Sequence, residues 1–557
     1  MKKLVFIFLF LFMASVLWTM PPMPGSGLTH DGSLREGDEC PMIFQAPSLS
    51  SEEGVMRTAK YPVSASTTGN KKVLVILADY TDLPFDYETG GTNHNTTYYN
   101  DLLQNSSNLT MKKYYSEQSR NKLNLSFHVT DTYHASKGYA YYGSNNSAGN
   151  DSKAVKLVEE LLTQAASDPA VPSGLDSCTV IVVHSGPGEE VGSGNPPYDI
   201  DTEKCIWSHR DKLSKHDIDP ITVHGTTFDS YLIVPEYYYY RGSFDATIGV
   251  FCHEFGHVLG LQDAYDYYYA TSGVGQWSLM GGGSWGSVGK AGTVSGSDPA
   301  PLMAWERLAL GWINEVDITP YSGTAGTYSF SEINSENKVY SVKLTDEQYL
   351  LLEGKAKNMT GSGMCVLENG LLITHLHKGI LSLYWSKNRI NSTSYRPHGA
   401  MVVEAVASNY KTNGLGNLWR KDNTNNRFTT TALFRKGTLT SIGPGTGSTT
   451  GNADIPFFPV FIDTIIGSGF VITLLGLWHI GRKKLCAGIV VAVAVVCFSM
   501  SCVVSSGGGG ETYDTGPNTN YYTSTYEVHS KTGSSGITIY NINCNEDGSG
   551  SFSIKKD

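Results

Sequence analysis

The sequence is short of charged residues and of cysteine for its length. Only 17% of its 557 residues are charged, and the formal net charge is −11. Because no basic stripe is present to neutralise phosphates, the composition excludes nucleic acid as a partner. Nine cysteines are too few to form a disulfide framework in so long a chain. The length itself predicts two or three folded units rather than one compact domain.

Glycine and tyrosine are abundant instead, with 60 and 33 residues, and this composition suits an exported protein better than a cytosolic one. The chain opens with MKKLVFIFLFLFMASVLW, in which two lysines precede an apolar run of roughly 15 residues. This pattern predicts a secretory signal peptide over residues 1–20. An N-terminal membrane anchor is the alternative, because no clean small-x-small cleavage site follows. Either way, the rest of the chain is predicted to be exported.

Residues 21–70 are rich in proline, glycine and serine and show no periodicity, so they are predicted to be a linker or propeptide. Beyond them, short apolar runs alternate with helix-like segments. KKVLVILADYTD and CTVIVVHSG have the form of buried strands, and SKAVKLVEELLTQAA carries apolar residues at helical spacing. Strands that alternate with helices predict an α/β sheet domain over residues 71–315.

The pattern changes after this domain. Residues 316–455 contain short alternating runs such as TYSFSEI, KVYSVKL and GLLITHL, which predict a β-rich, sandwich-like domain. Residues 456–502 hold two apolar runs around the basic residues 482–484, and these predict two transmembrane segments that tether the protein to a membrane. One span plus a hydrophobic core segment is the alternative, because Asp463 is costly in lipid. Residues 503–557 begin with a glycine-rich linker and are predicted to be a polar tail.

One helix-like stretch, DATIGVFCHEFGHVLG, carries a metal-binding pattern. Its apolar residues fall on one stripe, and Asp245 is a candidate N-cap. Residues four apart on a helix lie above one another, so His253 and His257 point the same way and can both bind one zinc ion. Glu254 stands beside that position, where it can take a proton from a zinc-bound water.

The residues that follow complete the pattern. Gly260 can adopt a left-handed conformation that ends the helix and turns the chain, which would bring Asp263 back as a third ligand. Three protein ligands leave one position open, which is the arrangement of a catalytic rather than a structural zinc site. Downstream, GVGQWSLMGGGSW places Met280 in a glycine-rich turn, where we expect it to form a hydrophobic floor under the histidines, the Met-turn.

Residues 71–455 resemble the M6 family of secreted metallopeptidases, the immune inhibitor A-like group within the metzincins. The matching pieces, in the family's order, are LVILADYTD, YYSEQS, CIWSHR, HEFGHVLGLQDAYD, GVGQWSLMGGGSW and PLMAWERLALGWI. The resemblance implies His253, His257 and Asp263 as zinc ligands and Glu254 as the general base and acid. It also implies a metzincin-like α/β catalytic domain, and QYLLLEG, GLLITHL and GAMVVEA match the family's second, β-rich module.

The sequence departs from the family pattern in a few places. Gln262 and Ala264 stand where the family usually has proline and leucine, and neither position takes part in the chemistry. Acidic residues that are usual in two family loops are missing, which weakens the expectation of calcium sites. Asp199, Asp201 and Glu203 could still bind calcium, although a solvated acidic loop is the simpler interpretation.

These observations predict an exported, membrane-tethered zinc metalloendopeptidase that hydrolyses peptide bonds of protein substrates. Tyr265 and Tyr267 are candidates for stabilising the tetrahedral oxyanion, although either could belong to the core. YLIVPEYYYY, shortly before the helix, is a candidate edge strand for an extended substrate, and Glu236 within it matches a family position without an evident role. The alternatives are a cell-surface binding protein with a metallopeptidase fold and no turnover, and a zinc hydrolase that acts on a non-peptide bond.

Overall fold

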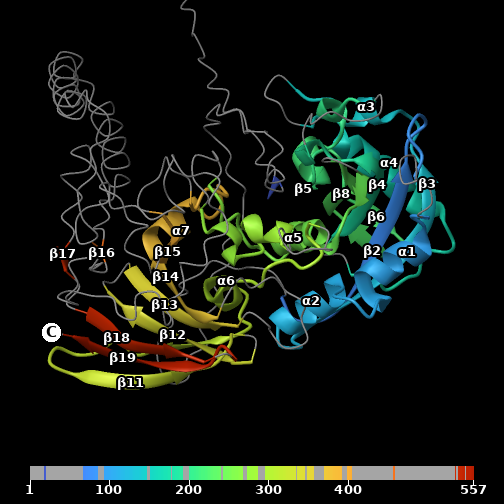
Figure 1. Cartoon of the computed structure of the whole chain (residues 1–557). Coiled ribbons are helices and arrows are strands. Elements are labelled where there is room, and N and C mark those ends of the chain that lie inside the picture. The colour runs from blue at the N-terminus through green and yellow to red at the C-terminus, as the bar shows by residue number, and fades with distance from the viewer. Residues whose placement is uncertain are drawn as a thin grey trace, which may run out of the picture.

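The computed structural model places most residues between 67 and 403 and a short C-terminal segment (Figure 1). It describes residues 18–19, 67–85, 93–146, 151–176, 179–191, 200–239, 243–266, 273–286, 295–333, 335–344, 348–356, 369–391, 398–403, 456–457, 533–534, 537–545 and 547–556. Most of the predicted linker or propeptide, and nearly all of the two predicted membrane segments, lie outside these residues. Among the residues described, no helix is both long and apolar enough to cross a membrane.

A mixed sheet forms the centre of the first folded unit. Its strand order is β1-β5-β8-β4-β2-β3, with β9 paired to β8. The strands are β1 (Trp18–Thr19), β2 (Gly69–Asp79), β3 (Leu123–His134), β4 (Val180–Pro187), β5 (His209–Lys212), β8 (Ser230–Tyr239) and β9 (Ser243–Asp245). β3, β2, β4 and β8 are parallel neighbours, whereas β5 runs antiparallel to β8. The predicted α/β sheet is thereby confirmed, and a separate two-stranded ribbon joins β6 (Ile221–Val223) to β7 (Thr226–Phe228).

Helices cover both faces of this sheet. They are α1 (Thr96–Asn100), α2 (Met111–Gln118), α3 (Tyr139–Tyr142), α4 (Ala154–Ser167) and α5 (Ile248–Val258). A further helix, α6 (Ala304–Ala309), packs in the core that contains α5. Successive side chains of a strand point to opposite faces, so Leu74 and Ile76 of β2 pack in the core with α4. Val73 and Val75 pack in the opposite core, with α2 and α5. The continuous apolar run of β2 is therefore explained by burial on both faces.

The sequence predicted that YLIVPEYYYY forms an edge strand, and this prediction is wrong. The run is β8, which lies between β4 and β5 in the sheet. Residues 231–234 are almost completely buried, because both faces of a central strand are covered. Beyond β8 lies β5, whose other side pairs with β1, and both β5 and β1 contact α5.

Two further sheets form the second unit, and their inner faces pack together. A five-stranded sheet has the order β10-β12-β13-β14-β15, and a three-stranded sheet has the order β11-β19-β18. The strands are β10 (Asn314–Asp317), β11 (Ala325–Phe330), β12 (Lys338–Lys343), β13 (Gln348–Lys355), β14 (Gly370–His377), β15 (Ala400–Val403), β18 (Ile537–Cys544) and β19 (Gly550–Lys556), with the helix α7 (Lys378–Tyr384) after β14. Val342, Leu350 and Ile373 share a core with Ile539 and Phe552, which makes the unit sandwich-like.

Strands β18 and β19 come from the region predicted to be a polar tail, and for residues 537–556 that prediction is corrected. β19 pairs along its length with β11 and lies at the centre of the three-stranded sheet. Figure 1 shows the red C-terminal strands beside yellow-green β11, although about two hundred residues separate them in the chain. Phe552 and Ile554 are fully buried there. The end of the chain therefore completes the second unit. Between β15 and β18 in the sequence, β16 (Pro456–Phe457) pairs with β17 (Gly533–Ser534).

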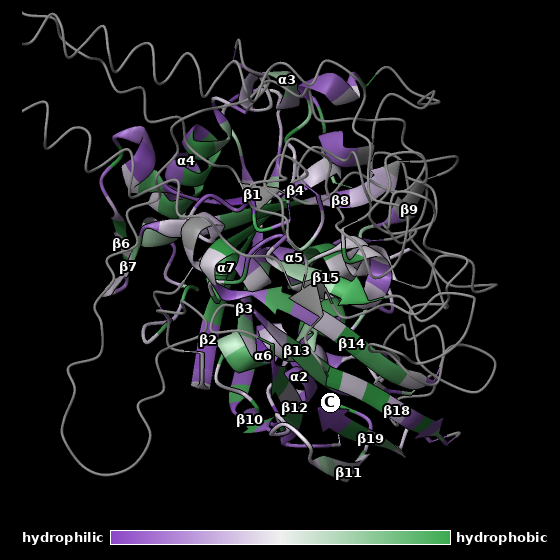
Figure 2. Cartoon of the chain, turned by 90° about the vertical axis from the view of Figure 1, so that its left-hand side faces the viewer, coloured by the Kyte–Doolittle hydropathy of each residue, from purple (hydrophilic) through white to green (hydrophobic). Residues whose placement is uncertain are grey.

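The two units share one hydrophobic core. Leu351 of β13 and Leu372 of β14 point away from the sandwich interior and join the cluster that contains Phe255 and Trp305. Figure 2 shows hydrophobic segments recurring along β14 and β18. The five-stranded sheet is thus buried on both faces, by the three-stranded sheet and by the first unit. The predicted boundary near residue 315 marks a change of secondary structure inside one packed body.

Replacing Phe552 with alanine is expected to destabilise the protein by about 3–5 kcal/mol, because the fully buried ring would leave a cavity. The ring packs against Tyr328 and Tyr340, with centroid separations of 5.8 Å in each case. Chemical denaturation followed by tryptophan fluorescence measures the change. Tyr321→Ala is the control, because that ring is 85% exposed and its loss should change stability by less than about 0.5 kcal/mol. Equal stability of the Phe552 variant and the parent would exclude the hairpin from the folded unit.

Candidate metal centre

Helix α5 lies in the interior, between the main sheet and the second unit (Figure 1). Every residue from Ile248 to His257 is buried, including His253, Glu254 and His257. The N-cap of the helix is Thr247, whose hydroxyl donates to the Ser295 carbonyl at 2.8 Å. The prediction of Asp245 as N-cap is wrong, because that residue ends the short strand β9.

The helix ends in the sharp turn that the sequence predicts. Gly260 has a φ of +99°, a left-handed conformation that glycine adopts without steric cost. The Leu261 amide donates to the Gly256 carbonyl at 3.0 Å, and the Gly260 amide donates to the His257 carbonyl at 3.1 Å. These bonds satisfy the last helical carbonyls and turn the chain back towards the helix. This reversal of the chain brings Asp263 close to His253 and His257.

His253, His257 and Asp263 converge on one point in the protein interior. Their candidate ligand atoms all lie within 4.8 Å of one another, and all three side chains are buried. Oδ1 of Asp263 is 3.1 Å from Nε2 of His253 and 3.3 Å from Nε2 of His257. Among the residues with assigned positions, this is the only such group of three metal-competent side chains.

The tautomers of both histidines follow from their backbone contacts. Nδ1 of His253 lies 2.9 Å from the Leu279 carbonyl, and Nδ1 of His257 lies 3.0 Å from the Leu261 carbonyl. A carbonyl only accepts, so each Nδ1 carries the hydrogen and each Nε2 keeps its lone pair. Partners of this kind orient metal-binding imidazoles in zinc sites.

The donor set fits a zinc ion. Nε2 of His253 and Oδ1 of Asp263 are buried and make no hydrogen bond, which is costly unless another partner is bound there. Burial lowers the pKa of His257, so its imidazole is neutral near pH 7. Neutral imidazole and ionised carboxylate are the forms that bind zinc.

The structure places two of the three other residues predicted to act in catalysis, Glu254 and Tyr265. Glu254 is fully buried on α5, directly after His253. Tyr265 is buried, and its ring lies 6.5 Å from the His253 ring at an interplanar angle of 22°. Tyr267 lies outside the described residues. Of the two tyrosines, only Tyr265 can therefore be placed beside a metal-binding histidine.

Met280, the residue predicted for a Met-turn, packs against helix α5, and its role as a floor under the histidines stays a prediction. A Cβ atom added to Gly256 would meet Sδ of Met280 at 2.5 Å, so the sulfur packs directly against the helix backbone. The Met280 carbonyl accepts from the Ala264 amide at 2.7 Å, which ties this turn to the segment after Gly260. Its amide donates to the Ser278 hydroxyl, and that hydroxyl donates to the buried Glu306 at 2.5 Å.

Asn388 contacts the candidate metal ligand Asp263, and the sequence does not predict this contact. Its Oδ1 accepts from the Asp263 amide at 2.7 Å, and its Nδ2 donates to Oδ2 of Asp263. Asn388 belongs to the second unit and lies 125 residues further along the chain. A lone asparagine at such a distance carries no sequence signal, so only the tertiary structure reveals the contact.

Glu236, which had no evident role in the sequence, holds a buried histidine. Its Oε1 lies 2.6 Å from Nδ1 of His94, and its Oε2 accepts from the Gly186 amide at 2.8 Å. Nε2 of His94 lies 3.0 Å from Asp245. Burial lowers the pKa of His94, but the hydrogen bonds to Asp245 and Glu236 outweigh it and raise the pKa to about 9. A charged imidazole thereby joins β8 to the strand that leads into α5.

The structure gives no support for calcium binding by the loop of Asp199, Asp201 and Glu203. Asp199 lies outside the described residues. Asp201 and Glu203 are exposed, and Asp201 forms an ion pair with Lys204 at 2.7 Å. Calcium binding by this loop stays a prediction from the sequence.

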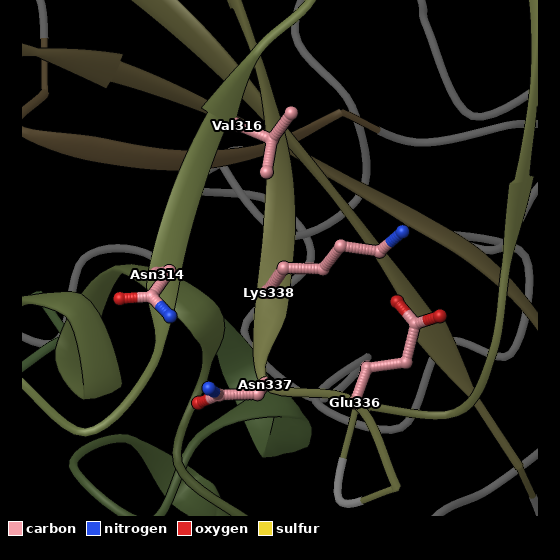
Figure 3. Close-up of a pocket in the computed structure, with 5 residues that line it drawn as sticks. All are labelled: Asn314, Val316, Glu336, Asn337 and Lys338. Atoms are coloured by element: carbon pink, nitrogen blue, oxygen red, sulfur yellow. The ribbon is translucent and has the colours of Figure 1, made fainter.

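An open hollow of about 380 Å³ lies far from the candidate metal centre in the fold, on strands β10 and β12. Asn314, Val316, Glu336, Asn337 and Lys338 line it (Figure 3). The Lys338 ammonium group donates a hydrogen bond to the Tyr340 hydroxyl at 2.9 Å. The hollow contains none of the metal-site residues and has no part in their chemistry.

Comparison with known proteins finds a family model and curated relatives that match this chain. The family model for the catalytic domain of immune inhibitor A peptidase M6 matches residues 59–177 and 172–313. Pre-pro-metalloprotease PrtV of Vibrio cholerae serotype O1 is 30% identical over 327 residues, covering 49% of this chain and 33% of the relative. Immune inhibitor A of Bacillus thuringiensis subsp. alesti is 30% identical over 306 residues, covering 44% of this chain and 41% of the relative. The chain thus spans less than half the length of these relatives.

Gly256→Ala is expected to destabilise the protein by about 1–3 kcal/mol, because the new methyl group collides with the buried Met280 sulfur. In an unobstructed helix the same change would stabilise by about 0.5–1 kcal/mol, so the sign of the effect is diagnostic. Thermal denaturation of Gly256→Ala, Met280→Ala and the double variant forms a cycle. The double variant should lose less than the sum of the single losses. If the two stability losses are strictly additive, Met280 does not pack against Gly256 of the helix.

Proposed function

We propose that this chain, in which residues 59–177 and 172–313 match the model for the catalytic domain of the M6 peptidase family, is an exported zinc metalloendopeptidase that hydrolyses peptide bonds of protein substrates. The observation that carries the proposal is the convergence of His253, His257 and Asp263 beside Glu254. Three protein ligands leave a fourth position for water or substrate, which a structural zinc site does not do. The succession of helix, glycine turn, third ligand and Met280 supports a metzincin-type arrangement.

The proposed roles of the residues follow from their chemistry. A bound zinc ion would activate water for attack and polarise the scissile carbonyl group. Glu254 accepts a proton from the attacking water and delivers it to the nitrogen of the leaving amine. Tyr265 is the better-supported donor to the developing oxyanion, because its ring lies beside His253. His253, His257 and Asp263 hold the ion, and burial keeps bulk water away from the charges that develop.

The role of Glu254 is separable from that of Asp263. Glu254→Gln keeps size and shape but cannot accept a proton, so turnover should fall by several orders of magnitude while zinc stays bound. Asp263→Ala removes a ligand, so zinc occupancy and turnover should both fall, with partial rescue by excess zinc. Metal analysis of the purified proteins and a casein cleavage assay, with and without a chelator, measure both quantities.

Glu159→Gln is the matched control, because it makes the same chemical change on the partly exposed helix α4. It should leave zinc content and turnover at the parental level. A Glu254→Gln protein that cleaves casein at the parental rate would overturn the enzymatic function. Zinc binding by a parent protein that never cleaves would favour the binding-protein alternative.

The place of action is proposed from the sequence ends. The predicted signal peptide would direct export, and the two apolar runs within residues 456–502 would anchor the protein to the membrane. Basic loops stay cytoplasmic, so the residues at 482–484 would leave the metal centre and the C-terminal hairpin outside the cell.

Protease shaving of intact cells tests this arrangement. Peptides from residues 71–455 should be released, whereas a cytoplasmic marker protein should stay intact. Protection of this region in intact cells, lost only on lysis, would refute the external location.

A further inference from the structure

The segment after α7, residues 385–391, lies against the turn that carries Asp263. Three of its side chains reach that turn, and all belong to the second unit. The Trp385 indole donates to the Gly260 carbonyl at 3.2 Å, and Asn391 donates to the Ala264 carbonyl at 2.8 Å. Asn388 lies between them in the chain and bonds to Asp263 itself. The turn is therefore held by side chains from the second unit on both sides of the candidate ligand.

We propose that Asn388 is a positioning residue for the metal centre, which fixes the carboxylate of Asp263 so that only Oδ1 faces the zinc site. The proposal rests on the zinc peptidase function proposed above. It also assigns the β-rich unit a direct part in the metal site, in addition to its packing role.

The geometry of Asn388 supports this assignment. Its amide group makes two bonds to the same residue, accepting from the main-chain amide of Asp263 and donating to the side-chain Oδ2. The two bonds fix both the backbone and the side-chain torsion of Asp263. Oδ1 is left without a hydrogen bond, directed at Nε2 of His253 and of His257. A carboxylate held in this way is prepared to offer a single oxygen to an ion.

The local backbone makes asparagine suitable at this position. Asn388 has a φ of +49°, a left-handed conformation that asparagine tolerates better than most residues. Its own amide donates to the Trp385 carbonyl at 3.1 Å, so the turn that carries it is closed. Asn388 is also 1% exposed, which shields both hydrogen bonds from water. Neighbouring Asn391 is anchored in turn by the Ala400 amide at 3.0 Å.

The test compares two variants of the full-length protein that loosen the same interface. Asn388→Gly keeps the left-handed backbone but removes both bonds to Asp263. Trp385→Phe keeps an aromatic ring beside Trp305 and loses the bond to Gly260, which is not a metal ligand. Asn388→Ser, whose hydroxyl is too short to bridge both atoms of Asp263, serves as a second variant if the glycine variant does not fold.

The first measurement is the zinc dissociation constant, obtained by competition with a chromophoric chelator. Partners that orient metal ligands are worth about 10–100-fold in metal affinity. We expect the Asn388 variants to bind zinc about 10–100-fold more weakly, and Trp385→Phe to stay within about threefold of the parent. Circular dichroism and the melting temperature of the zinc-free proteins separate this effect from loss of folding. Excess zinc should restore most of kcat in the Asn388 variants without changing KM, because substrate contacts are untouched.

The possible results distinguish failure of the positioning role from failure of the proposed function. Zinc binding by folded Asn388 variants as tight as that of Trp385→Phe would overturn the positioning role, while the zinc-dependent activity of the parent would leave the proposed function standing. A lowered kcat that zinc does not restore would also count against the role. A parent protein that binds no zinc would overturn both the positioning role and the proposed function.

Discussion

Two imidazole nitrogens and one carboxylate oxygen face one another in the buried interior, and the surrounding segments hold them there. Polar atoms buried in this way are costly, so the opposite side of each group must be satisfied. His253 is held by the turn at Leu279, His257 by the turn at Leu261, and Asp263 by Asn388. The turns at Leu261 and Leu279 and the segment that carries Asn388 thus all meet at the candidate metal centre.

The β-rich unit is therefore more than an appendage. Its five-stranded sheet is buried on one face by the C-terminal hairpin and on the other by the core around α5. Separating the units would expose both the shared core and the Asp263 turn. Removal of the hairpin would uncover the opposite face of the same sheet. Residues near 260, 390 and 550 are accordingly linked through successive layers of packing.

Charged side chains also stabilise the strands that lead into α5. His94 is held between Glu236 and Asp245, and its pKa of about 9 keeps the imidazole charged near neutral pH. The positive charge offsets the two carboxylates, which would otherwise repel each other where β8 passes into β9. Glu236 thereby gains a physical role, which is to fix the strands that lead to α5.

The local features could be predicted from the sequence: the helix with histidines four residues apart, the turn at Gly260, and the alternation that separates α/β from β-rich regions. They depend on the spacing of apolar residues and on the conformational freedom of one glycine, and both act over a few residues. The folded chain was needed to show that β8 is central, that residues 537–556 join the sandwich, and that Asn388 reaches Asp263. Strand neighbours and long-range side-chain contacts depend on how separate segments pack, and the order of residues along the chain does not encode that locally.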